Sequence, residues 1–85
     1  MPTQTTYWHK PLTDPIDPTD GPLDKLVTVS DAARFVTELE TWRQARPHWV
    51  HAGELILKAG NSGRAKDIDK ATTHMRQALR VEGWL

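Results

Sequence analysis

Apolar residues recur at three- and four-residue steps through most of the C-terminal two-thirds of the chain, which is the period of an amphipathic α-helix. The most regular stripe predicts a helix over residues 64–82. Its inward positions are Ile68, Ala71, Thr72, Met75, Ala78 and Leu79. Charged and polar residues fill the positions between them, so we expect one face of this third helix to lie in a core.

Two earlier stripes predict helices over residues 31–43 and 47–59. The first stripe consists of Ala32, Phe35, Val36, Leu39 and Trp42. The second consists of Trp49, Ala52, Gly53, Ile56 and Ala59, with Leu55 beside it. Both stripes favour burial against other elements of the fold.

Residues at the ends of these stripes favour helix starts and stops. Ser30 is a good N-cap for the first helix, with Asp31 favourable in its first turn. Pro47 suits the first turn of the second helix, where its missing N–H costs nothing. Gly60 is placed to end the second helix in the left-handed conformation, and Gly83 closes the third helix.

Two segments before the helices are rich in β-forming residues and predict short strands over residues 5–11 and 24–29. Pro11 ends the first or confines it to an edge. Residues 13–22 contain three prolines, three aspartates and one glycine, which predicts a loop of successive turns. The predicted fold class is α+β, with a two-stranded N-terminal β element packed on three α-helices.

The length of 85 residues predicts a single domain over residues 1–85, with residues 1–4 disordered at the end of the chain. A domain of this size buries only about 60–65% of the surface of its unfolded chain, which leaves little material for a closed active site. No Gly-rich phosphate loop, Ser-His-Asp pattern or carboxylate pair with a plausible base is present. We therefore expect no enzymatic activity, no catalytic residue and no cofactor.

The chain has no cysteine, which excludes disulfide bonds and cysteine zinc sites. No apolar run approaches the roughly 20 residues of a transmembrane helix, and the first ten residues lack the apolar centre of a signal peptide. These features predict a cytoplasmic protein without membrane contact.

Charge is unevenly distributed although the formal net charge is zero. Acidic residues dominate residues 1–40 and basic residues dominate residues 41–85, which gives halves near −4 and +4. Such halves can complement each other within one fold or between two copies. Because a two-stranded element is marginal and leaves open edges, we predict a homodimer that pairs through a strand edge.

Three polar residues near the start of the second predicted helix have a spacing that suggests a metal site. His48, His51 and Glu54 follow one another at three-residue steps, and His74 could add a ligand. The spacing differs from the i, i+4 histidine pair of helical zinc sites, so we interpret these residues as ordinary solvated side chains and expect no metal.

An interaction surface is predicted from the remaining basic and aromatic residues. Four tryptophans are many for 85 residues, and aromatic side chains at the edge of a core are typical interface anchors. The predicted surface consists of Trp8, Trp49, Trp84, Lys66, Lys70, Arg76 and Arg80. The alternatives are a weak nucleic-acid binder that uses the third helix, and a small-ligand protein with a tryptophan-lined groove. Because the chain lacks a net basic surplus, nucleic acid is not the expected partner.

Several short motifs resemble a small bacterial domain of unknown function, catalogued as number nine hundred and eighty-two and found mostly in rhizobial and related alphaproteobacteria. The matching residues are Trp8-His9-Lys10-Pro11, Val27-Thr28-Val29-Ser30, Ala32-Ala33, Phe35-Val36, Trp42, Pro47, Ala52, Lys58-Ala59-Gly60, Ala65, Ala71, Ala78 and Glu82-Gly83. The chain departs from that pattern at Trp42-Arg43, where a Trp-Pro pair is expected, and at Leu55-Ile56, where a cysteine is common. The resemblance implies an α+β fold in the bacterial cytoplasm and supplies no reaction, cofactor or catalytic residue.

Taken with the size and charge of the chain, these observations predict a non-enzymatic protein-interaction module. We expect a small accessory or regulatory protein that binds an unidentified protein partner.

Overall fold

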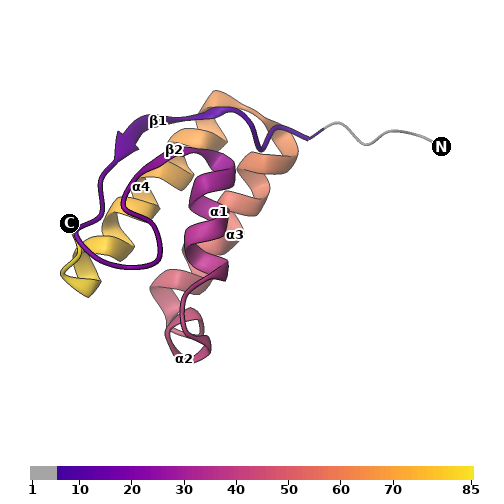
Figure 1. The fold of residues 1–85 in the computed structure, drawn as a ribbon. Helices are drawn as coiled ribbons and strands as arrows, with labels where there is room; N and C mark the ends of the chain where they lie inside the picture. Colours follow the sequence, from indigo (N-terminus) through magenta and orange to yellow (C-terminus); the bar gives the residue numbers. More distant parts are fainter. Residues whose placement is uncertain (1–5) are drawn as a thin grey trace.

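The computed structural model describes residues 6–85 (Figure 1). The elements in chain order are β1 (Pro11–Ile16), β2 (Leu26–Thr28), α1 (Val29–Thr37), α2 (Thr41–Gln44), α3 (Pro47–Ser62) and α4 (Ala65–Glu82). The predicted α+β class is confirmed, because two antiparallel N-terminal strands pack with three substantial helices. The disorder predicted for residues 1–4 lies outside the described residues.

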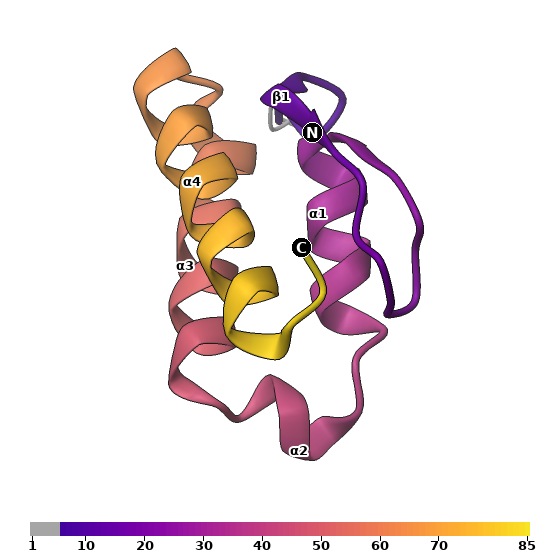
Figure 2. The ribbon, with the colours of Figure 1, turned by 90° about the vertical axis from the view of Figure 1, so that its left-hand side faces the viewer.

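The three longer helices run alternately up and down, and α3 contacts both α1 and α4 (Figures 1 and 2). The strands lie across one end of these helices, where β1 contacts α4 and β2 contacts α1. All six inward positions predicted for the third helix are buried. The largest fully buried side chains are Trp49, Phe35, Ile16, Leu26, Met75, Leu79 and Val29.

The first strand was predicted over residues 5–11, and the structure places it later, at Pro11–Ile16. Tyr7 and Trp8 turn away from the sheet, and the Tyr7 N–H donates to the Gly60 carbonyl over 2.8 Å. This contact outweighs the β propensity of the segment. Four of the ten residues of the predicted 13–22 loop therefore belong to β1, which tolerates Pro15 because it is an edge strand whose pairing with β2 is irregular between Pro11 and Ile16.

The first helix was predicted over residues 31–43, and the structure divides this segment into α1 and α2. Thr28, and not Ser30, is the N-cap, and it forms a capping box with Asp31. After α1 the chain turns, and the Gln44 side-chain amide donates to the carbonyls of Thr37 and Leu39. Because of this turn Trp42 leaves the core stripe, and 59% of its surface is exposed.

The second helix extends three residues beyond the predicted end at residue 59. Gly63 is the left-handed C-cap, with a φ of 65°, whereas Gly60 is helical and buried. Gly60 is needed for a different reason, since a Cβ there would lie 2.5 Å from the Trp8 ring. Gly83 ends α4, as predicted, and the structure shows it in the left-handed conformation.

Every helix between residues 6 and 85 is too short or too polar to pass through the hydrocarbon layer of a membrane.

Candidate functional site

An apolar groove of about 260 Å³ runs between α1 and α3. Ala33, Val36 and Thr37 form its α1 wall, and Gly53, Ile56 and Leu57 form its α3 wall, with Trp8 among its lining residues. Thr37 supplies the only hydroxyl group among these side chains. The groove can therefore bind apolar groups, and its lining residues do not form a set of catalytic side chains.

Trp8 is held at the groove by contacts with both helices. Its ring lies on the Cα of Gly60 in α3, and its carbonyl accepts a hydrogen bond from the Ser30 N–H in α1 over 2.9 Å. The preceding Tyr7 ring lies on Gly63 at the end of α3. Lys10 adds a bond from its Nζ to the Gly63 carbonyl over 3.0 Å. The N-terminal segment is thus fixed where α1 begins and α3 ends, and it closes that end of the groove.

The outer surface of α3 continues the groove with exposed apolar side chains. Val50 is 46% exposed and Leu57 is 55% exposed, and they are two helical turns apart on one side of the helix. Gly53 lies between them. A Cβ on Gly53 would have only one neighbour within 4 Å, the Val36 Cγ1 at 4.0 Å, so packing within the chain does not require a glycine.

The exposed face of α1 carries a pair of opposite charges outside the groove, and Glu38 lines a different hollow together with Arg43 and Trp84. Arg34 and Glu38 are both exposed and one turn apart, with 3.9 Å between the Arg34 Nη2 and the Glu38 Oε2. Each directly follows a groove residue, Ala33 or Thr37. On α3, Glu54 holds the equivalent position after Gly53 and is also exposed.

A second polar feature surrounds Glu82, whose side chain is only 4% exposed at the end of α4. Its carboxylate accepts a hydrogen bond from Arg43, from the Arg46 Nη1 over 3.3 Å and from the Trp49 Nε1 over 3.1 Å. The His48 Nε2 lies 3.0 Å from the same carboxylate. These contacts join α4 to α2 and to the first turn of α3, so the cluster stabilises the packing of these helices.

Arg43 also forms an aromatic stack on the surface beside this cluster. Its guanidinium carbon lies 4.3 Å from the centre of the Trp42 ring and 4.6 Å from that of Trp84. The arginine therefore lies between two indole rings, a favourable arrangement for a planar cation. Trp84 in turn contacts Phe35 and Trp49, at centroid distances of 6.1 and 6.5 Å.

Glu82 gives the fold a dependence on acidity. Burial raises the pKa of Glu82, but hydrogen bonds from His48 and Trp49 and the charges of Arg43 and Arg46 together bring the pKa below its ordinary value. A carboxyl whose pKa is lowered by folding stabilises the fold fully above its unfolded pKa and loses that contribution as the pH falls through its folded pKa.

We predict that the stability difference between the wild type and Glu82→Gln is constant near neutral pH and shrinks below about pH 4.3, the ordinary glutamate pKa. Urea unfolding between pH 7 and pH 3 measures this difference. The pKa values of Asp31 and Asp67 are also lowered, chiefly by hydrogen bonds from the Val27 amide and the Ser62 hydroxyl. Both aspartates are present in both proteins, so their contributions cancel. A difference that stays constant down to pH 3 would contradict the prediction.

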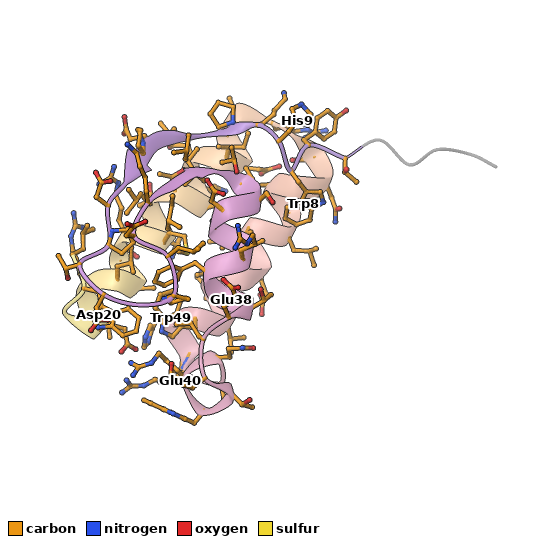
Figure 3. The ribbon with its side chains drawn as sticks, in the orientation of Figure 1. Trp8, His9, Asp20, Glu38, Glu40 and Trp49 are labelled. Atoms are coloured by element: carbon orange, nitrogen blue, oxygen red, sulfur yellow. The ribbon has the colours of Figure 1, made fainter. Side chains whose placement is uncertain are left out.

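The three tryptophans of the predicted interaction surface have different surroundings, although Trp49 and Trp84 pack against each other. Trp49 is fully buried and belongs to the core, so it offers no surface for contact. Trp8 lines the α1–α3 groove, whereas Trp84 lines a separate hollow with Arg43. Figure 3 shows Trp8 and Trp49 toward opposite ends of α3. Trp8 and Trp84 thus each line a hollow of their own, and the small-ligand alternative stays a prediction.

The basic residues of the predicted surface lie along α4. Lys66, Lys70 and Arg80 are exposed, and Arg76 donates to the Pro15 carbonyl over 3.2 Å. Asp69 is exposed among them and interrupts the positive charge. A nucleic-acid role for this face stays the alternative interpretation, and nucleic acid is still not the expected partner.

The histidines considered for a metal site have separate environments. His48 contacts Glu82, whereas His51 packs against His74 with 4.5 Å between ring centroids. Across residues 6–85, no group of three or more histidine, aspartate or glutamate side chains is placed to hold a metal ion.

Two groove features were not identified from the sequence: the exposed pair Val50 and Leu57, and the open position at Gly53. The pair Val50 and Leu57 could have been found from the sequence, because these two apolar residues are seven positions apart and lie outside the apolar stripe of the second predicted helix. The role of Glu82 was also missed.

Comparison of the chain with protein-family models, with curated proteins and with solved structures gives no match. The resemblance to the alphaproteobacterial domain family therefore stays a prediction.

Proposed function

We propose that this chain is a non-enzymatic protein-interaction module, of accessory or regulatory type, that binds an apolar helix face in the groove between α1 and α3. The observation that carries the proposal is the apolar groove with Val50 and Leu57 exposed at its side. An apolar groove between two helices commonly binds the apolar face of an amphipathic helix. Full burial of a valine or leucine side chain contributes about 1.5–3 kcal/mol, so covering two half-exposed ones favours association.

The polar groups of the fold support an interaction role over a catalytic one. The two buried carboxylates have partners within the chain: Asp67 accepts from the Ser62 hydroxyl over 2.5 Å, and Glu82 accepts from its arginine and tryptophan donors. Both therefore serve packing between helices.

The strand edges offer less to a partner than the groove does. On β1 the Thr13 N–H already donates to the Thr72 Oγ1 of α4 over 3.2 Å. On β2 the N–H groups of Val27 and Thr28 both donate to the Asp31 carboxylate. Because pairing through an edge uses free backbone donors, these bonds favour the helical face over the strand edge that the sequence suggested.

A photo-crosslinking amino acid at position 57 tests the groove in the cells that carry the gene, with position 81 as the matched control. Val81 is 63% exposed on α4, so it is as accessible as Leu57 and lies on another helix. We expect a discrete crosslinked protein from position 57, joined through a helical segment, and none of it from position 81. A Gly53→Leu change, which fills the groove, should abolish that product. Identical products from both positions would contradict the proposed function.

A further inference from the structure

Two histidines from different helices meet where α3 packs against α4. His51 lies in the second turn of α3 and His74 lies near the middle of α4, and these two helices run side by side (Figure 2). The centres of the two imidazole rings are 4.5 Å apart, and the ring planes are inclined at 81°. The packing of the helices therefore brings two nitrogen-bearing rings to one point of the surface.

Both rings are accessible from solvent and differ in their surroundings from the neighbouring His48. The His51 side chain is exposed and that of His74 is half-buried. His48, one turn earlier on α3, lies 3.0 Å from the Glu82 carboxylate. Among residues 6–85, neither His51 nor His74 forms an ion pair with a carboxylate. Neutral imidazole nitrogen is a preferred ligand of zinc, copper, nickel and iron.

The distance between the two rings indicates the geometry that a shared metal ion would have. A metal ion about 2.0–2.1 Å from an imidazole nitrogen lies about 3.2 Å from the centre of that ring. Ring centres 4.5 Å apart then subtend an angle of about 90° at an ion that binds both rings. Neighbouring ligands meet at this angle in the square-planar and tetragonal complexes of Cu(II) and Ni(II). Tetrahedral zinc requires about 109°, which would place the ring centres about 5.2 Å apart.

We propose that His51 and His74 together bind Cu(II), with Ni(II) as a weaker ion of the same geometry. Each histidine supplies one nitrogen, and water fills the other positions, because no third histidine, aspartate or glutamate among residues 6–85 completes the set. Copper is the stronger ligand because affinities at a given nitrogen site rise from Ni(II) to Cu(II). This site differs from the one considered in the sequence, since it leaves out His48 and Glu54. It is also separate from the groove, which lies between α1 and α3.

Thermal unfolding of the full chain, with copper chloride alone as the probe, tests the site. Free Cu(II) at about 100 times the dissociation constant should raise the midpoint by at least about 5 °C, because the ion binds the fold that holds the two rings together. His51→Ala and His74→Ala should each abolish this rise, and neither removes a fully buried side chain. His9→Ala is the matched control, because His9 is exposed and lies outside the helices, and its rise should equal that of the wild type.

Electron paramagnetic resonance of the bound Cu(II) gives a readout that a change in stability cannot imitate. The wild type should show a tetragonal copper signal coupled to two imidazole nitrogens, and His51→Ala or His74→Ala should leave no more than one. Ni(II) should raise the unfolding midpoint more than Zn(II) does, because an angle of about 90° suits nickel and not tetrahedral zinc.

Three results would overturn the proposal. The first is an unfolding midpoint that Cu(II) does not raise. The second is a rise that persists in both His51→Ala and His74→Ala, which would indicate adventitious binding only. The third is a larger rise with Zn(II) than with Cu(II) or Ni(II). Should an alanine variant fail to fold, His51→Asn and His74→Asn retain a polar side chain and repeat the same comparison.

Discussion

Replacing Glu82 by alanine is expected to lower the free energy of unfolding by about 3–5 kcal/mol, the range measured when one partner of a buried charge pair is removed. The change leaves the Arg43 guanidinium facing a cavity and deprives the Trp49 indole N–H of its acceptor. A buried donor without an acceptor costs the full desolvation energy of that group. Small domains have about 0.05–0.15 kcal/mol of stability per residue, so this loss removes a large part of the total stability of the fold.

Equilibrium unfolding in urea, followed by tryptophan fluorescence, measures the effect of Glu82→Ala. Glu54→Ala is the matched control, because Glu54 is an exposed glutamate on a helix and its loss should change stability by less than about 0.5 kcal/mol. Glu82→Gln should lie between the wild type and Glu82→Ala, since an amide oxygen can keep some of the hydrogen bonds. If Glu82→Ala unfolds within 1 kcal/mol of the wild type, the cluster does not fasten α4 to α2 and α3.

Helix periodicity alone predicts most of the core. The stripe from Ile68 to Leu79 is buried throughout, because an 18-residue helix with one apolar face has few alternatives in a chain this small. Trp42 continues the apolar stripe predicted for residues 31–43, but its side chain is exposed because the helix breaks at residues 38–40. The break leaves backbone carbonyls without helical partners, and the Gln44 side chain donates hydrogen bonds to those of Thr37 and Leu39. This contact has no local sequence signal.

Less of the candidate site can be predicted from the sequence, because its residues come from segments that are far apart along the chain. Trp8 reaches the groove only because Gly60, more than fifty residues later, leaves space for its ring. Glu82 had a usable signal: an acidic residue in the last turn of a helix is unfavourable against the helix dipole, which indicates a specific cationic partner. The identity of those partners follows only from the fold, which brings Arg43 of α2 and Arg46 at the start of α3 to the end of α4.

The glycines that end α3 and α4 have the same left-handed backbone conformation but different neighbours, so replacing each by alanine separates backbone strain from steric overlap. Gly63 and Gly83 have φ values of 65° and 78°. A Cβ on Gly63 would overlap the Tyr7 ring, whereas a Cβ on Gly83 would have no neighbour within 4 Å. Alanine at either position costs about 1–2 kcal/mol in backbone strain. At Gly63 alone, the displaced aromatic ring adds about 1–3 kcal/mol.

We therefore expect Gly63→Ala to lower the free energy of unfolding by about 2–5 kcal/mol and Gly83→Ala by about 1–2 kcal/mol, again by urea denaturation. The difference measures how firmly the N-terminal segment is fixed to the end of α3, and equal losses would show that Tyr7 moves aside at no cost. The same comparison reaches the groove, because Trp8 follows Tyr7 directly and lies on Gly60. If Tyr7 is displaced and takes Trp8 with it, the groove loses its closed end. Crosslinking from position 57 should then weaken in Gly63→Ala under conditions where that variant is folded, and should be unchanged in Gly83→Ala.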